Sequence, residues 1–165
     1  MKSAWRSSIT ERVFWTALFS IFLLTSNAWA NDWSLKDKEG VRYTLSGLQG
    51  KWVLVNFWAP WCPPCIQEIP GLVSVQKQHK DLQVIGVAVM YKTKQEVIDV
   101  IRSQAVIYPV VFGNEDIASD FGGMMGLPTS FLYSPAGKLV GHHDGPLSPV
   151  EVEQALGGGN SIFVP

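Results

Sequence analysis

The sequence is poor in the features that define several classes of protein. It holds only two cysteines in 165 residues, whereas disulfide-stabilised secreted domains carry several widely spaced ones. Its 13 lysines and arginines stand against 14 acidic residues, a net charge of −1, so we expect no basic surface for nucleic acid. Because hydrophobic residues make up 47% and charged residues 16%, the composition excludes disorder and suits one folded domain.

The first thirty residues have the pattern of a secretory signal peptide. Three basic side chains flank the start of an apolar stretch over residues 13–24, and polar residues lead to the cleavage pattern Ala28-Trp29-Ala30. Twelve apolar residues are too few to cross about 30 Å of hydrocarbon comfortably. A stretch extended to Ala30 would be longer, so an uncleaved membrane anchor is the alternative. We expect residues 1–30 to be a signal peptide.

Hydrophobic periodicity after residue 31 predicts strands alternating with helices. The alternation indicates parallel strands with right-handed crossovers, and a closing hairpin makes the sheet mixed. We expect one α/β domain over residues 31–157, a monomer because no repeat or coiled coil is present, and a flexible tail over 158–165. The expected strands are 33–35, 41–45, 52–59, 82–90, 110–112, 129–133 and 138–143, and the expected helices are 62–79, 94–103, 115–121 and 148–156.

Both cysteines lie in one motif, Trp61-Cys62-Pro63-Pro64-Cys65, between a strand and a helix. A disulfide across so short a loop removes little unfolded-state entropy, so a structural role has a weak physical basis. At a helix N-terminus, unpaired N–H groups and the helix dipole favour a thiolate, and prolines fit the first helical positions. We predict that Cys62 attacks client disulfides and that Cys65, deeper in the helix, resolves the mixed disulfide.

Two stretches of the chain resemble the thioredoxin superfamily. Residues 57–65 are similar to its active-site stretch, and residues 126–129 to the loop that bears its cis-proline. Within the superfamily the chain resembles the TlpA/ResA-like branch, on the hairpin, the extra segment 92–108 and the run 65–70. The resemblance covers residues 33–156. It implies a thioredoxin fold with a mixed central sheet flanked by helices, an N-terminal hairpin and a central inserted segment.

The resemblance also implies a function and a location. Its members are bacterial, extracytoplasmic and usually reducing, often in cytochrome c maturation. The expected partners are disulfide-bearing clients and a membrane protein that donates electrons, with no cofactor. A cis bond before Pro128 would turn its loop toward Cys62 and leave the Leu127 backbone free to pair with a client, so we expect Leu127, Pro128 and Thr129 to bind clients. The alternative is an ordinary loop proline that starts the strand at Thr129. Trp61, which flanks the dithiol, and Pro63 and Pro64, which lie between the cysteines, would form the surface that binds clients, although simple surface packing also explains Trp61.

One position departs from thioredoxin, which has a buried aspartate where this chain has Asn56. Asparagine cannot take the proton of the resolving cysteine. Glu68 lies three residues after Cys65, on the same helix face. A carboxylate shielded there would have a raised pKa and would serve as the base. The alternative is an exposed glutamate favoured by the helix dipole.

Two other functions remain open on the sequence alone. A periplasmic copper chaperone would use the cysteines with ligands from His142-His143 and Met124-Met125. Adjacent histidines on a strand point to opposite faces, however, and suggest one inward and one solvated ring; we predict no metal site. A disulfide oxidant or isomerase would stabilise the thiolate, and the two prolines between the cysteines offer no side-chain donor for that, so we favour a reductant.

Overall fold

The computed structural model describes residues 32–158 and 162–164, so the predicted signal peptide lies outside the described residues. Strands and helices alternate as predicted, and α3, β5 and β6 have the predicted bounds. No helix of the described part is long and apolar enough to cross a membrane. The elements are β1 (Ser34–Lys36), β2 (Arg42–Thr44), the 3-10 turn η1 (Ser46–Leu48), β3 (Trp52–Trp58), α2 (Pro63–Gln78), β4 (Leu82–Ala88), α3 (Lys94–Ser103), β5 (Val110–Phe112), α4 (Glu115–Asp120), β6 (Thr129–Tyr133), β7 (Leu139–Asp144) and α5 (Pro149–Leu156).

The central sheet is mixed, as the sequence predicts. Its strand order is β5-β4-β3-β6-β7, with β3 parallel to β4 and β4 parallel to β5. β6 and β7 run antiparallel, and β1 and β2 form a separate hairpin. β3 lies in the middle, and residues 53–58 are buried, which explains why its sequence is apolar almost without interruption.

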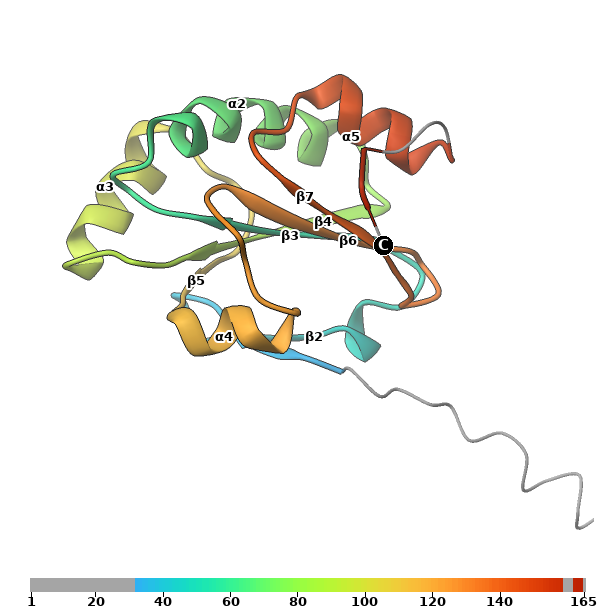
Figure 1. Ribbon diagram of the computed structural model, residues 1–165, viewed down its shortest axis with the longest axis horizontal. Coiled ribbons are helices and arrows are strands. Elements are labelled where there is room, and N and C mark those ends of the chain that lie inside the picture. The colour runs from blue at the N-terminus through green and yellow to red at the C-terminus, as the bar shows by residue number, and fades with distance from the viewer. Residues whose placement is uncertain (1–31, 159–161, 165) are drawn as a thin grey trace, which may run out of the picture. The chain divides into compact units, whose positions relative to one another are not determined.

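Two layers cover the sheet. Helices α2, α3 and α5 lie over one face, which we call the helical face, and the β1–β2 hairpin with α4 lies over the other, the hairpin face (Figure 1). Alternate residues of β3 supply the two cores because successive strand side chains point to opposite faces. Leu54 and Trp58 pack beneath the helices, while Val53, Val55 and Phe57 pack against the hairpin.

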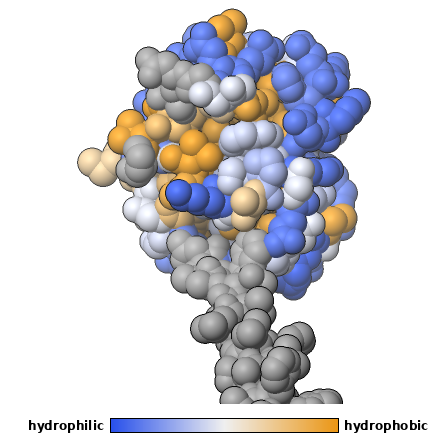
Figure 2. Space-filling model, turned by 90° about the vertical axis from the view of Figure 1, so that its right-hand side faces the viewer, coloured by the Kyte–Doolittle hydropathy of each residue, from blue (hydrophilic) through white to orange (hydrophobic). Residues whose placement is uncertain are grey.

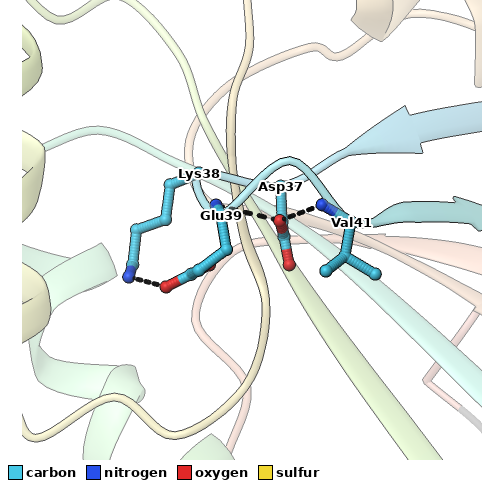
Figure 3. A network of polar contacts seen from close by, with 4 residues as sticks. All are labelled: Asp37, Lys38, Glu39 and Val41. Carbon is cyan, nitrogen blue, oxygen red and sulfur yellow. Dashed lines mark hydrogen bonds and ion pairs between the residues drawn. The ribbon is translucent and has the colours of Figure 1, made fainter.

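Asp37 organises the turn of the predicted N-terminal hairpin (Figure 3). Its Oδ1 accepts hydrogen bonds from the Glu39 amide at 3.0 Å and the Val41 amide at 2.8 Å, an Asx-type turn. Lys38 forms an ion pair with Glu39, and its amide donates to the Val110 carbonyl at 2.8 Å. The turn is therefore attached to β5 of the central sheet.

Helix α2 carries the cysteine motif and follows the sequence prediction at both ends. Cys62 is the N-cap residue and His79 the C-cap residue, with Pro70 inside the helix. The next residue, Gly71, faces α5: a Cβ there would lie 3.1 Å from Pro149 Cδ. The two helices therefore approach closely where Gly71 has no side chain.

Residues 162–164, near the end of the chain, pack against the domain. Phe163 is buried, at 5% exposure, and the Val164 amide and carbonyl each bond to His142 at 2.8 Å. A Cβ on Gly141 would lie 2.6 Å from the Val164 carbonyl oxygen, so the glycine admits this segment. Within the segment 158–165, for which the sequence predicts a flexible tail, an apolar side chain and a strand edge hold residues 162–164.

The boundaries of the strands also differ slightly from prediction. β4 ends at Ala88 instead of Met90, and Met90 has a left-handed backbone, φ 53°. β3 ends one residue early, at Trp58, and β7 runs from Leu139 to Asp144. The chain therefore leaves the sheet before Met90, which places that residue beside the cysteine motif.

Candidate active site

The two cysteines lie where β3 leads into α2, and they form a disulfide with a Cα–Cα distance of 5.3 Å. Cys62 has an extended backbone, φ −94° and ψ 104°. Its amide donates to the Ala59 carbonyl and its carbonyl accepts from the Ile66 amide, both at 3.1 Å. Cys62 is 3% exposed and Cys65 is fully buried. Cys62 therefore lies at the start of the helix, and Cys65 is buried more deeply, as predicted.

Trp61, in the cysteine motif, is 57% exposed. Its indole N–H donates to the Met90 carbonyl at 2.7 Å, and Met90 is itself 49% exposed. Pro63 is exposed and Pro64 half-buried. Because a hydrogen bond fixes the indole while the ring remains in contact with solvent, Trp61 presents an apolar surface beside the dithiol.

The opposite end of the sheet, at the right of Figure 1, mixes hydrophilic with hydrophobic residues (Figure 2).

The peptide bond between Leu127 and Pro128 is cis, which confirms the prediction drawn from the resemblance. Leu127 packs against the apolar cluster that includes both cysteines. Within the described residues its amide and carbonyl have no backbone partner. Thr129 is fully buried, and its hydroxyl lies 2.9 Å from the Gly126 carbonyl and 2.6 Å from Asp144 Oδ1. The Thr129 side chain therefore holds the loop and does not face a client.

Glu68 is buried, at 4% exposure, so the alternative of an exposed glutamate is wrong. Its Oε1 accepts from Asn56 Nδ2 and its Oε2 from the Leu147 amide, both at 2.8 Å. Burial raises the pKa of Glu68 to about 7, and the bonds from Leu147 and Asn56 oppose that shift only in part. This carboxyl, one turn after Cys65, exchanges a proton near neutral pH.

Asn56 is the partner of Glu68, which the sequence did not reveal. Its side-chain N–H₂ group also donates to Ser130 Oγ at 3.0 Å, and Ser130 lies opposite Asn56 in the β3–β6 register. Asn56, Ser130 and Leu147 have no local signal in the sequence, since 12, 74 and 79 residues separate the bonded pairs. Asn56, which stands where thioredoxin has an aspartate, therefore donates a hydrogen bond to the carboxyl of Glu68.

Solvent approaches Glu68 from the side of α5. A groove of about 420 Å³ between α2 and the segment before α5 is lined by Glu68 together with residues from both elements: Gln67, Gly71, Pro146, Leu147, Ser148, Pro149 and Glu151. Glu151 belongs to the capping box of α5, in which Ser148 and Glu151 bond reciprocally. The carboxyl is buried in the protein yet close to a route by which protons can reach water.

The two histidines lie on opposite faces of β7, as predicted. The His142 ring lies 6.0 Å from the Phe131 ring, and the His143 ring lies 6.2 Å from the Phe163 ring. Both side chains are half-buried, so the expectation of one inward and one solvated ring is wrong in detail. Between residues 32 and 164, leaving aside 159–161, no three His, Cys, Asp or Glu residues converge as a metal site.

Comparison with known proteins agrees with this architecture. The AhpC/TSA family matches residues 27–142. The chain is 34% identical over 131 residues to the thioredoxin-like protein YneN of Bacillus subtilis, covering 77% of this chain and 76% of that protein. It is 38% identical over 112 residues to the thiol-disulfide oxidoreductase ResA of Bacillus subtilis, covering 67% and 63% respectively.

A solved structure gives the same picture. The thiol:disulfide interchange protein of the thioredoxin family from Chlorobium tepidum superposes with a TM-score of 0.70 at 32% identity, covering 78% of this chain and 93% of that one. The mixed sheet, the buried dithiol at the start of α2 and the cis-proline loop are thus accompanied by sequence identity over most of the domain. The chain therefore belongs to the AhpC/TSA family, as a thioredoxin-like thiol–disulfide oxidoreductase related to ResA.

Proposed function

We propose that the protein reduces disulfides of exported client proteins through Cys62 and Cys65, with Glu68 as the base for the resolving step. One observation carries the proposal: Glu68 is buried one helical turn after Cys65, with a pKa raised to about 7. A carboxyl with such a pKa is matched to proton transfer at neutral pH.

The reaction proceeds in two exchanges. The Cys62 thiolate attacks one sulfur of the client disulfide, and the other client sulfur leaves as a thiolate. Glu68 then takes the proton of the Cys65 thiol, and the Cys65 thiolate attacks the Cys62 sulfur of the mixed disulfide. The second client sulfur leaves as a thiolate and takes up a proton. The client gains two electrons, and the protein is left with the Cys62–Cys65 disulfide, the form that the structure shows.

Two features of the site support the reducing direction. Pro63 and Pro64 occupy the first positions of α2 and have no N–H to donate to a thiolate. The buried carboxylate of Glu68 places a negative charge near Cys65, which disfavours a second one there. Since a strongly stabilised thiolate makes a dithiol a strong oxidant, a site whose intervening prolines add no donor beyond the helix N-terminus favours a reductant.

The surface around the dithiol suits an extended client segment. Trp61 and Pro63 are exposed, and the Leu127 backbone has no partner within residues 32–158 and 162–164. An extended peptide would pair with the backbone of Leu127, just before Pro128, and place its side chains on Trp61 and Pro63. A cysteine of the client would then lie at Cys62.

The N-terminal sequence and the family support a proposal for the location and the partners. We propose export directed by residues 1–30, with residues 31–157 as the working domain, either free in the bacterial periplasm after cleavage or held at the membrane. The clients carry disulfides, and the haem-binding cysteines of apocytochrome c are the class that best fits a ResA relative. A membrane protein that carries electrons outward would restore the dithiol, and the protein would act as a monomer.

The reduction potential of the Cys62–Cys65 couple tests the direction. The protein is equilibrated in thiol redox buffers, and the oxidised fraction is read by alkylation of the free thiols. We expect a value near or below about −220 mV, toward that of thioredoxin. A value near about −120 mV would mark a donor of disulfides and would reverse the proposed direction.

A further inference from the structure

One polar atom in the core beneath α2 has no part in this scheme. The Tyr108 hydroxyl is buried and has no hydrogen-bond partner within the described residues, and Tyr108 as a whole is 5% exposed. Burial of an unpaired hydroxyl costs free energy that a phenylalanine ring would avoid. An orphan group of this kind points to a role in the chemistry nearby.

The position of the Tyr108 ring is fixed by the strands below it. Tyr108 lies between α3 and β5, and the next residue, Pro109, accepts a hydrogen bond from the Gly86 amide at 2.9 Å. A Cβ on Gly86 would lie 3.2 Å from Tyr108 Cε2 and 3.1 Å from Trp58 Nε1. Both rings therefore lie over Gly86, in the space that a side chain at this position would fill.

The strand register places that space beside the Glu68 site. Asn56 pairs with Gly86 on β4 and with Ser130 on β6. Paired residues on neighbouring strands share a face, so Ser130, Asn56 and Gly86 form a row under α2. The Tyr108 ring covers the end of the row next to Asn56, which binds Glu68. Asn56 Oδ1 is also buried without a hydrogen-bond partner among the described residues, so this part of the core holds two unpaired polar atoms.

An electrostatic interaction also connects Tyr108 with Glu68. Burial raises the pKa of Tyr108, and the nearby charge of Glu68 raises it further. This coupling places the phenol within electrostatic reach of the carboxyl while it remains outside the hydrogen bonds that Glu68 already makes. A neutral hydroxyl stabilises an ionised carboxyl when it donates a hydrogen bond to it.

We propose that Tyr108 is a positioning residue of the resolving step, and that its hydroxyl donates a hydrogen bond to the ionised Glu68 carboxyl, directly or through one bridging water. The inference rests on the proposed role of Glu68 as base. The hydroxyl offsets part of the burial cost of the carboxylate, and so keeps Glu68 able to accept the Cys65 proton at neutral pH.

The groups that face Glu68 come from five elements. Cys65 comes from α2 itself, Asn56 from β3, the Leu147 amide from the segment before α5, Tyr108 from the segment before β5, and Glu151 from α5 across the groove. Tyr108 and Cys65 belong to the same apolar cluster, and Glu151 is the other acidic side chain of the set. Tyr108→Phe therefore changes one polar group of the site and keeps the ring.

The test is the titration of Glu68 in the Tyr108→Phe protein. The pKa of Glu68 is read from its side-chain carboxyl ¹³C shift, and the rate of mixed-disulfide resolution is measured against pH. We expect both midpoints to rise by about 0.7 pH unit, which slows resolution at pH 7 roughly threefold. Tyr133→Phe is the matched control, since Tyr133 is a buried tyrosine on the hairpin face, and we expect it to leave both midpoints unchanged.

Two results separate this inference from the proposal beneath it. If Tyr108→Phe leaves the Glu68 pKa and the rate midpoint unchanged while Glu68→Gln removes the midpoint, Tyr108 has only a packing role and Glu68 is still the base. If Glu68→Gln keeps the midpoint, the base is another group and the role of Tyr108 is lost with it. Upward shifts in both readouts, absent in Tyr133→Phe, support the inference.

Discussion

The two faces of the central sheet are built from the same strands but hold different kinds of core. The hairpin face packs aromatic rings against one another: Phe121 contacts the rings of Trp33, Phe57, Phe131 and Tyr133 at centroid distances of 5.3–6.4 Å. The helical face instead buries Asn56, Glu68 and Ser130 among its apolar residues. Apolar packing therefore stabilises the hairpin face, whereas the helical face bears the free-energy cost of a buried carboxyl.

The difference shows how a strand with period-two alternation serves two purposes. Phe57 points into the aromatic core, and Asn56, its neighbour in sequence, points beneath α2 and binds Glu68. Since successive side chains alternate in direction, the chemistry and the packing are separated within one strand. Substitutions on the hairpin face should then change stability, and substitutions on the helical face should change proton transfer and exchange.

The largest effect is expected at the dithiol. Cys62→Ser should reduce disulfide exchange to the uncatalysed background, because the attacking sulfur is gone. Cys65→Ser should trap mixed disulfides with clients. These adducts are detected on non-reducing gels and by mass spectrometry. A Cys65→Ser protein that keeps full catalytic turnover would contradict the two-cysteine mechanism.

The next largest effect is expected in the aromatic core. Phe121→Ala removes a ring that contacts four others, and we expect it to lower the free energy of unfolding by about 3–5 kcal/mol. Denaturant unfolding measures the loss. At temperatures where the variant is folded, the pH profile of exchange should match that of the unchanged protein; a shifted profile would mean that the two faces are not separate.

The pH dependence of the free energy of unfolding should reveal the raised pKa of Glu68. Its pKa is raised in the folded protein to about 7, from 4.5, so the native state binds the proton more tightly than the unfolded chain. Stability from this group is fully present below pH 4.5 and is lost as the pH rises to about 7, by roughly 3 kcal/mol. Urea unfolding of the disulfide form across this range measures the slope.

Glu68→Gln should remove that slope, and Glu153→Gln, at an exposed position of α5, should keep it. If both variants retain the slope, another group causes it. A slope of the opposite sign in the unchanged protein would mean that the Glu68 carboxyl is stabilised in its ionised form by the fold.

The smallest effect is expected at the start of α5. Ser148 caps this helix and shares a capping box with Glu151, so Ser148→Ala should cost about 1 kcal/mol in the free energy of unfolding. Thermal unfolding measures it. A loss as large as that of Phe121→Ala would show that the cap also supports the Glu68 site through the adjacent Leu147 amide.

Local patterns predict most of the fold and part of the site. Apolar runs, turn residues and the Ser148 cap place every helix and strand within a few residues. The dithiol is predictable because its motif lies between a strand and a helix, and the cis bond at Pro128 because residues 126–129 resemble a known loop. The motif also places Trp61 beside the dithiol, although the hydrogen bond of Trp61 to the Met90 carbonyl depends on where β4 ends.

The remaining features depend on contacts distant in sequence. The burial of Glu68 results from Asn56, Leu147 and the close approach of α5 at Gly71, and helical spacing alone cannot distinguish it from an exposed glutamate. The order of residues 162–164 depends in the same way on Gly141, which leaves room for Val164. In both cases a local pattern permits two outcomes and tertiary packing decides.

The central claim is that Glu68 removes the proton from Cys65. Its most direct test is the single-turnover rate of mixed-disulfide resolution against pH, in the unchanged protein, in Glu68→Gln and in Glu153→Gln. We expect the rate to rise with pH through a midpoint near 7 in the first and third proteins, and to be about 100-fold lower without that midpoint in Glu68→Gln. An unchanged rate and midpoint in Glu68→Gln would contradict the account.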